Sequence, residues 1–314
     1  MQTLNRRNFL KSTALAGAGF VAAPLAGLAL EQQAKTAKKL ILAHTNDVHS
    51  RLEPFPMDGS RNAGMGGVAR RASMIEQLRK EHGNSFLLVD AGDIFQGTPY
   101  FNLYKGEPEI KAMTKMGYDA ATIGNHDFDG GLENLATQMM HASFPLVVAN
   151  YDFSGTPMEG KTIPYHIIKK GDLKIGITGV GIELKGLVPE SLYLTTKYLS
   201  PIEQVNVQAA YLKKKGCDLI VCLSHLGDKY NDNKVSDEVL AKETEWVDVI
   251  IGGHTHRFFE QPRTYKNKKG YDVIVNQAGW GGIQLGILEL QSSTAKDAKL
   301  IGSKSLQISE KNAN

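Results

Sequence analysis

Five short apolar runs, each ending in polar residues of the kind that bind metal ions, constrain this chain more than any other feature. With the residues that follow them, the runs read ILA-HTNDVH, FLLVD-AGD, AATI-GNHD, LIVCL-SHLGD and DVII-GGHTH. Apolar runs of this length, bounded by glycine and polar residues, are typical of buried strands in a helix-covered sheet. Polar groups just past the carboxyl ends of such strands converge on one edge of the sheet. The repetition therefore predicts a single site, built from Asp47, His49, Asp93, Asn125, His225, His254 and His256.

The patterning predicts one αβ domain between about residues 40 and 290. Its first half alternates strands at 40–45, 86–90, 120–123 and 145–149 with helices at 68–82, 109–116 and 132–141. A hairpin then interrupts this order and indicates a second, mixed sheet, with strands at 165–169 and 173–180. The remaining expected elements are a helix from Pro201, strands at 217–224 and 247–252, and a final antiparallel pair at 271–277 and 284–290. A polar tail is expected after about residue 292.

The charge balance gives no argument for a nucleic-acid partner. The sequence holds 36 basic and 33 acidic residues, a formal charge of +3. Arg6, Arg7 and Lys11 are the only charged residues before Glu31, so removal of residues 1–29 leaves 33 basic residues against 33 acidic ones. A nearly neutral protein lacks the cationic surface that attracts phosphate backbones or anionic membranes. We therefore expect no nucleic acid among its partners.

The amino terminus has the features of an export signal. Arg6 and Arg7 stand before Phe9-Leu10-Lys11, which matches the twin-arginine pattern, and a charge-free stretch rich in alanine and glycine follows from Ser12 to Leu30. The alternative is an uncleaved membrane anchor, because these 19 uncharged residues approach the ~20 that a span requires. The small residues and Pro24 favour the signal. We expect residues 1–30 to be a twin-arginine signal peptide, no stable membrane span, and a periplasmic or secreted mature protein of residues 31–314.

The donor atoms of the predicted site suit two divalent ions. Asp47 and His49 are two residues apart, and His254 and His256 repeat this spacing, so each pair can face one point. Oxygen and nitrogen donors without thiolate suit Mn²⁺, Fe²⁺ or Zn²⁺. A catalytic ion usually takes three protein ligands, so seven fit two ions that share a carboxylate and lie about 3.5–4 Å apart. Such a pair generates hydroxide from water near neutral pH and holds the oxygens of a phosphoryl group.

The ordered motifs Asp-x-His, Gly-Asp, Gly-Asn-His-Asp, a later histidine and Gly-His-Thr-His resemble those of the calcineurin-like metallophosphoesterase superfamily. Longer segments resemble its 5′-nucleotidase branch, specifically the amino-terminal catalytic domain: His44–His49, Gly92–Pro99, Gly124–Asp129 and Gln277–Gly279. The resemblance covers about residues 39–290. It implies an α/β fold, a four-layer α/β/β/α metallophosphatase sandwich of two mixed sheets flanked by helices.

The resemblance also assigns roles to individual residues. One ion would be held by Asp47, His49, Asp93 and His256, and the other by Asp93, Asn125, His225 and His254, with Asp93 as the bridge. His126 would be the catalytic histidine, and Asp129 the carboxylate that orients it and favours its protonated form. A cation beside the phosphoryl oxygens, which is also an acid for the leaving alkoxide, agrees with this chemistry. His44 would support the ligands from behind, whereas Phe258, Phe259 and Trp280 would contact the substrate or pack in the core.

The substrate is less well defined than the reaction. The resemblance implies a dimetal phosphomonoesterase that uses a metal-bridging hydroxide, with nucleoside 5′-monophosphates as the leading substrate class. Members of the 5′-nucleotidase branch carry a carboxy-terminal domain that forms the nucleoside pocket, and no counterpart follows residue 290 here. We expect either that the chain acts alone on a broader range of exposed phosphoesters, or that a separate chain supplies the substrate-binding domain.

Several other activities remain open within the same branch. Cyclic nucleotides, nucleotide sugars and sulfur esters are alternative substrates for such a site. A subunit that binds metal or phosphate with little turnover is the alternative outside enzymes. The presence of both His126 and Asp129 argues against this last reading.

Overall fold

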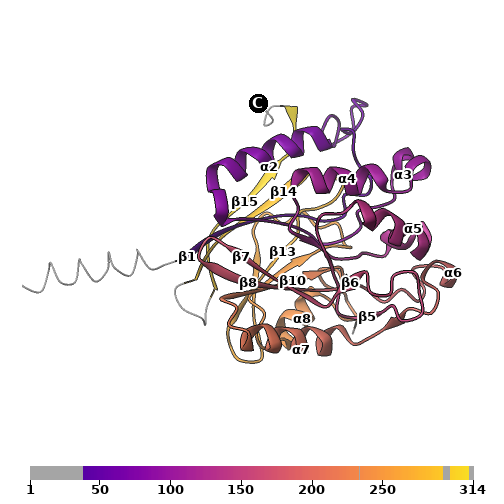
Figure 1. Cartoon of the computed structure of the whole chain (residues 1–314). Coiled ribbons are helices and arrows are strands. Elements are labelled where there is room, and N and C mark those ends of the chain that lie inside the picture. Colours follow the sequence, from indigo (N-terminus) through magenta and orange to yellow (C-terminus); the bar gives the residue numbers. More distant parts are fainter. Residues whose placement is uncertain (1–37, 233, 293–297, 311–314) are drawn as a thin grey trace, which may run out of the picture. The chain divides into compact units, whose positions relative to one another are not determined.

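Two mixed β-sheets lie at the centre of the computed structural model, which describes residues 38–232, 234–292 and 298–310 (Figure 1). The predicted export signal lies outside these residues. In spatial order, the seven-stranded sheet consists of β15 (Ala298–Gln307), β14 (Gln284–Ser292), β1 (Lys38–Thr45), β2 (Phe86–Asp90), β3 (Ala120–Ala121), β4 (Leu146–Val147) and β6 (Thr162–Ile163). The six-stranded sheet consists of β12 (Arg263–Lys266), β13 (Asp272–Asn276), β11 (Val249–Gly252), β10 (Leu219–Ser224), β8 (Leu173–Val180) and β7 (Tyr165–Lys170).

The central strands are buried on both faces, which explains why their sequences are continuous apolar runs. In β2, Phe86 and Leu88 pack beneath helices, whereas Leu87 and Val89 face the second sheet. This follows from the period of two along a strand. The core between the sheets joins such residues of β1 and β2 to residues of β8, β10 and β11.

Helices cover the outer face of each sheet and complete four layers, α/β/β/α. The seven-stranded sheet packs against α2 (Val68–His82), α3 (Pro99–Tyr104), α4 (Glu107–Met116), α5 (Gly131–Gln138) and α6 (Glu190–Tyr193). The six-stranded sheet packs against α7 (Pro201–Lys214) and α8 (Asp237–Glu243). Three 3₁₀ turns, at Gly83–Ser85, His126–Phe128 and Met139–His141, and a small pair of strands, β5 (Tyr151–Asp152) and β9 (Lys197–Tyr198), complete the described elements. The predicted fold class is confirmed.

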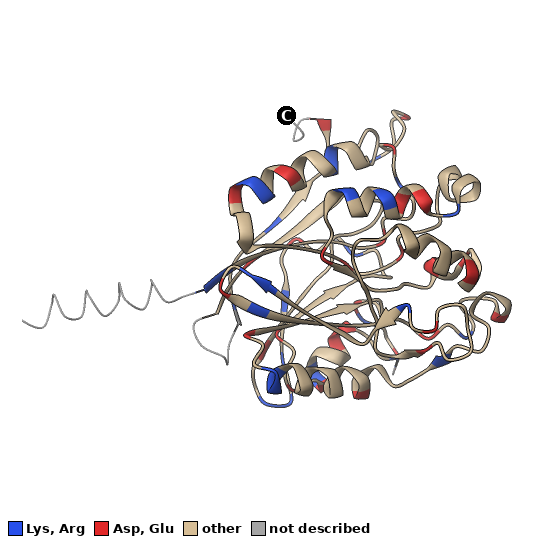
Figure 2. Cartoon of the chain, in the orientation of Figure 1, with Lys and Arg blue, Asp and Glu red and all other residues tan. Residues whose placement is uncertain are grey.

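Local signals predicted several elements correctly. Ser200 caps α7 through a hydrogen bond from the Glu203 backbone N–H to its hydroxyl, with Pro201 in the first turn. The predicted hairpin is β7 and β8, which pair antiparallel. Figure 2 shows basic and acidic residues interspersed along α2, whereas in α4 and α7 the glutamates come first and the lysines follow. Among the described residues, every helix is too short or too polar to cross a membrane.

Two predictions for the carboxy-terminal part were wrong. The expected antiparallel pair at 271–277 and 284–290 does not form, because β13 joins the six-stranded sheet beside β11 while β14 joins the seven-stranded sheet. The region expected to be a polar tail contains β15, which pairs antiparallel with β14 along nearly its whole length. Its polar side chains suit an edge strand that has one neighbour.

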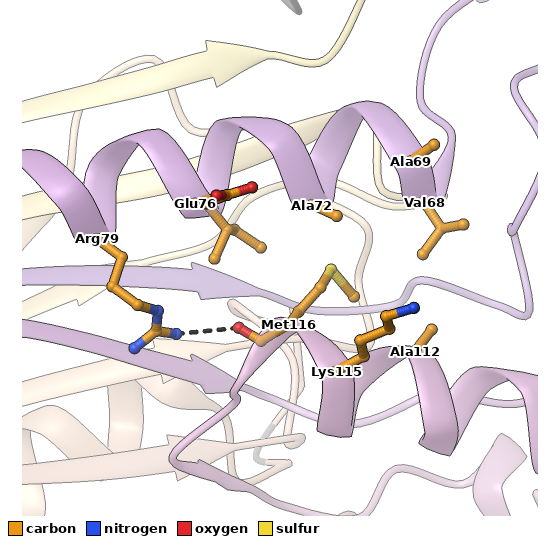
Figure 3. A pocket seen from close by; sticks show the side chains of 9 residues that line it. Val68, Ala69, Ala72, Glu76, Arg79, Ala112, Lys115 and Met116 are labelled. Carbon is orange, nitrogen blue, oxygen red and sulfur yellow. Dashed lines mark hydrogen bonds between the residues drawn. The ribbon is translucent and has the colours of Figure 1, made fainter.

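A groove of about 520 Å³ lies between α2 and α4 (Figure 3). Its wall is mainly apolar, with Val68, Ala72 and Met116 among its lining residues, and Arg79 at one end donates to the Met116 carbonyl oxygen. None of its lining residues belongs to the strand-end clusters. The groove therefore lies apart from the site described below.

Candidate active site

The seven side chains predicted from the strand ends come together, although they arise from two sheets rather than one. β1, β2 and β3 are parallel in the first sheet, and β10 and β11 are parallel in the second. The first sheet supplies Asp47, His49, Asp93 and Asn125, and the second supplies His225, His254 and His256. The expectation that one sheet edge provides the whole site was therefore wrong. The edges of two stacked sheets share it.

The side chains form two groups of potential ligand atoms. In the first, the atoms of Asp47, His49 and His256 lie within 4.8 Å of one another, with His49 Nε2 and His256 Nε2 2.9 Å apart. The second group is Asp93, His225 and His254, also within 4.8 Å. The Asn125 amide oxygen lies 2.8 Å from His254 Nδ1 and so extends the second group.

Asp93 belongs to the second group and also faces the first. Its Oδ2 atom is 3.0 Å from His225 Nε2 and 3.9 Å from His49 Nε2. Asp93 is buried, and its other oxygen, Oδ1, accepts a hydrogen bond of 2.8 Å from the backbone N–H of His126. This is the position that a bridging carboxylate would occupy.

Hydrogen bonding prepares His225 to bind a cation. The His225 Nδ1 atom lies 2.6 Å from the Ala91 carbonyl oxygen, which can only accept, so Nδ1 carries a proton and Nε2 faces Asp93. Burial lowers the pKa of His225, but the charge of Asp93 outweighs burial and raises it above its ordinary value. The pair thus holds a proton that a divalent cation would replace. The donor set and its geometry fit such an ion.

Five of the seven residues have a left-handed backbone. The φ angles are positive at Asp47 (50°), His49 (52°), Asp93 (57°), His254 (69°) and His256 (54°). This conformation is uncommon outside glycine and concentrates at functional sites. Backbone hydrogen bonds hold the loops in place: Asp47 N–H donates to the Gly92 carbonyl at 2.9 Å and His49 N–H to that of Asp93 at 3.0 Å.

Glycines directly before Asn125 and His254 allow the side chains of the site to approach closely. A Cβ atom on Gly253 would lie 2.8 Å from His225 Nδ1 and 3.2 Å from Asp47 Oδ2. A Cβ atom on Gly124 would lie 2.2 Å from Asp93 Oδ1. Packing therefore requires glycine at both positions, because any side chain would collide with the buried groups of the site.

His126 and Asp129 form a separate pair at the open side of the site. His126 Nδ1 lies 2.8 Å from Asp129 Oδ2, and the imidazole side chain is 42% exposed. The hydrogen bond with Asp129 raises the pKa of His126, although partial burial acts in the opposite direction. The His126 ring lies 5.3 Å from that of His49, centroid to centroid. His126 therefore lies next to the two groups but belongs to neither, and its pKa is raised by its hydrogen bond with Asp129.

Asp127, which has no predicted role, joins two loops of the site. Its buried carboxylate accepts hydrogen bonds from four backbone N–H groups, those of Asp93, Ile94, Phe95 and Gly124. Asp127 therefore fastens the loop after β2 to the loop after β3. The sequence feature that could have indicated this role is the position of Asp127 in the motif Gly-Asn-His-Asp, directly after the candidate catalytic residue His126.

Asn46 and Gln277 connect the other loops. Asn46 Nδ2 donates to Asp47 Oδ2 at 2.6 Å, and Asn46 Oδ1 accepts from the Ala278 N–H at 2.8 Å. Gln277 Oε1 accepts from the Arg257 N–H at 2.7 Å, and its Nε2 donates to the Gly253 carbonyl at 2.8 Å. Both residues lie in segments that resemble the family. These segments therefore contain the residues that hold the loops together as well as the candidate ligands.

The remaining candidates divide between core and site. His44 lies buried between the sheets, where its Nε2 accepts a hydrogen bond from Asn276 Nδ2 at 2.9 Å and burial lowers its pKa to about 3. Phe259 packs in the core beside α7 and α8, whereas Phe258 is exposed. The Trp280 indole stacks on the His256 ring, with 5.8 Å between centroids and 12° between planes.

Several known proteins are similar to this chain in sequence and in fold. The sequence matches the profile of the family described as calcineurin-like phosphoesterase over residues 40–258. A snake venom 5′-nucleotidase of Gloydius brevicauda is 36% identical over 273 residues, which cover 80% of this chain and 45% of that protein. The 5′-nucleotidase of Homo sapiens is 32% identical over 89% of this chain and 50% of its own length.

Among solved structures, the 5′-nucleotidase precursor of Thermus thermophilus matches with a TM-score of 0.77 and 34% identity, over 88% of this chain and 55% of that one. The NAD nucleotidase of Haemophilus influenzae matches with a TM-score of 0.76 and 26% identity, over 87% of this chain and 50% of that one. The chain spans about half the length of the curated relatives it matches. From the profile match and this level of identity, the chain belongs to the calcineurin-like phosphoesterase family, in its 5′-nucleotidase branch.

Proposed function

We propose that the chain is a phosphoester hydrolase that depends on two divalent metal ions and acts on nucleoside 5′-monophosphates. The observation that carries the proposal is the meeting of seven oxygen and nitrogen donors in two adjacent groups, with the His126–Asp129 pair at their open side. Metal-binding proteins without turnover have no need of such a pair. Its presence favours an enzyme over a binding subunit.

We assign one ion to Asp47, His49, Asp93 and His256, and the other to Asp93, Asn125, His225 and His254. Mn²⁺, Zn²⁺ and Fe²⁺ all suit these donors. When bound, the ions would activate a water molecule and neutralise charge on the phosphoryl oxygens. The chain's own contribution is to fix the donors through the left-handed loops and to keep Asp93 between the two groups.

His126 is proposed to act on the substrate directly. Its Nδ1 is held by Asp129, so Nε2 is the nitrogen available to the substrate, and the hydrogen bond with Asp129 raises the pKa of the ring and so favours its protonated form. A protonated imidazole can donate a hydrogen bond to a phosphoryl oxygen and a proton to the departing alkoxide. Asp129 is the positioning residue of this pair.

The test is a substrate panel on the purified chain supplied with Mn²⁺, Zn²⁺ or Fe²⁺. We expect release of phosphate from nucleoside 5′-monophosphates to exceed turnover of 2′,3′-cyclic nucleotides, nucleotide sugars, p-nitrophenyl phosphate and a sulfur ester. Faster turnover of one of the others would reassign the substrate within the branch. No turnover of any ester with any metal would contradict the hydrolase assignment for the isolated chain, and would favour a separate chain that supplies the substrate-binding domain.

We also propose that residues 1–30 direct export through the twin-arginine route to the periplasm or the medium. The proposal is supported by the Arg6-Arg7 motif and the uncharged stretch that follows it. It is also supported by the similarity to 5′-nucleotidases of snake venom. Replacing both arginines with lysine preserves the charge but removes the motif. We expect that variant to remain in the cytoplasm on cell fractionation; unchanged export would contradict the route.

A further inference from the structure

His256 is the most weakly enclosed member of the first donor group. Its side chain is 41% exposed, whereas those of His49 and Asp47 are 11% and 0% exposed. Its backbone is left-handed, at φ 54°, and it lies in the loop that follows β11. An exposed imidazole must be ordered by neighbours before it can serve as a ligand at low cost in side-chain entropy.

The usual ordering contact is missing from His256 among the described residues. Ligand histidines are commonly fixed by a hydrogen bond from the nitrogen that does not face the ion, as His225 is by the Ala91 carbonyl. Both polar contacts of His256 with described residues involve Nε2, which lies 3.4 Å from Asp47 Oδ1 and 2.9 Å from His49 Nε2. No described residue hydrogen bonds to its Nδ1. Some other contact must therefore set the plane of the ring.

Trp280 supplies a contact of the required kind. Its indole lies nearly parallel to the His256 imidazole, 12° between planes and 5.8 Å between centroids, within the range of favourable aromatic pairs. The Phe55 ring packs edge-on against the indole at 5.3 Å and 84°, and the Arg51 guanidinium lies 4.1 Å from the centroid of Phe55. Trp280 thus has a second aromatic neighbour besides His256.

The backbone around Trp280 is attached to both ligand loops. Gly279 N–H donates to the Arg257 carbonyl at 2.9 Å, next to His256 in sequence, and Gly281 N–H donates to the Asp47 carbonyl at 2.7 Å. Both glycines have positive φ. The indole is therefore fixed relative to the two residues, Asp47 and His256, whose side chains must meet at one ion.

We propose that Trp280 is a positioning residue for His256: its indole face holds the imidazole plane so that Nε2 faces Asp47 and the first ion. The role rests on the proposed metal site, and it adds a residue outside the ligand set. It also makes Trp280 an intrinsic reporter of that ion. The chain has two tryptophans, and the ring of the other, Trp246, contacts the ammonium groups of Lys213 and Lys269.

The test compares Trp280→Leu with Trp280→Phe and, as matched control, Trp246→Phe in the full chain. Ion binding is measured by calorimetric titration with Mn²⁺, and folding by circular dichroism and thermal melting. We expect Trp280→Leu to bind one of the two ions roughly tenfold more weakly, at the lower end of the effect of outer contacts on metal affinity. Trp280→Phe keeps a ring that can stack on His256, so its affinity for Mn²⁺ should stay within about threefold of that of the wild type. The affinity of Trp246→Phe should equal that of the wild type.

A second measurement remains informative if Trp280→Leu does not fold. In Trp246→Phe the only indole is Trp280, and bound Mn²⁺ beside His256 should quench its emission with the stoichiometry of one ion. Unchanged emission while calorimetry shows both ions bound would overturn the proposal, as would wild-type affinities in a folded Trp280→Leu. A wild-type chain that binds no ion would contradict the proposed function itself, and the positioning role with it.

Discussion

Replacement of Asp127 by asparagine should lower the stability of the ion-free protein, because this side chain holds the loops of the site and is not itself a candidate ligand. The Asp127 carboxylate accepts four backbone hydrogen bonds, two at each oxygen. In Asp127→Asn one oxygen becomes an amide nitrogen, which donates and cannot accept. Two of the four buried N–H groups therefore lose their acceptor, and the loop that carries Asp93 loses one or two of its three hydrogen bonds to this side chain.

The structure sets the size of the effect. A buried donor without an acceptor costs about 1–3 kcal/mol, so two such donors cost about 2–6 kcal/mol. Burial raises the pKa of Asp127 to about 7, which means that desolvation already offsets part of what this carboxylate contributes. We therefore expect a loss of about 2–3 kcal/mol, at the lower end of that range. Since whole proteins are stable by about 5–15 kcal/mol, the change is large but compatible with folding.

The assay is urea unfolding of the ion-free chain, with equal slopes required before midpoints are compared. Asp129→Asn is the matched control, because Asp129 is partly exposed and its carboxylate pairs with His126 alone among the described residues. That variant should keep its stability within about 0.5 kcal/mol and lose turnover. Stability of Asp127→Asn within the same margin would refute the reasoning, because the two buried donors would then have found other acceptors.

Three further predictions follow from the site and the core. His126→Ala should lower kcat by about 10²–10⁴-fold while both ions remain bound, and wild-type turnover would contradict its catalytic role. Removal of the ions with a chelator should lower the melting temperature reversibly, since an ion present at 100 times its Kd contributes about 2.7 kcal/mol; an unchanged melting curve would argue against ion binding. Gly286→Ala places a methyl group 2.2 Å from buried His44 Nε2 and should cost about 1–3 kcal/mol in urea unfolding, whereas Gly302→Ala meets only the flexible side chain of Glu289 and should cost less.

The sequence was sufficient to predict that the seven side chains come together, but not to assign the strands to their sheets. An apolar run followed by a polar cluster indicates a strand and the end at which the site lies. Both features can be read from the local sequence without knowing which strand lies beside it. Sheet membership depends on pairing, which such runs do not encode. Neighbouring strands in sequence usually pair, so an antiparallel pair of 271–277 with 284–290 was the natural expectation.

The reason that this pair does not form is found at the site itself. The segment between β13 and β14 donates from Gly279 to the Arg257 carbonyl and from Gly281 to the Asp47 carbonyl. These contacts draw the chain from the six-stranded sheet across to the seven-stranded one. The crossing therefore connects the two loops that carry the first group of donors, and a short hairpin turn would leave both carbonyl groups without these partners.

The left-handed ligand loops explain why so many buried side chains support the site. For most residues this conformation costs about 1–2 kcal/mol, so five such residues approach the total stability of a domain. Aspartate and histidine tolerate it better than most side chains, and they are also metal ligands, so the same residue types satisfy the backbone and the ion. The hydrogen bonds of Asp127, Asn46 and Gln277 to the loops supply the remaining compensation. Loss of one of these three residues should therefore weaken the ion-free protein and the binding of ions together.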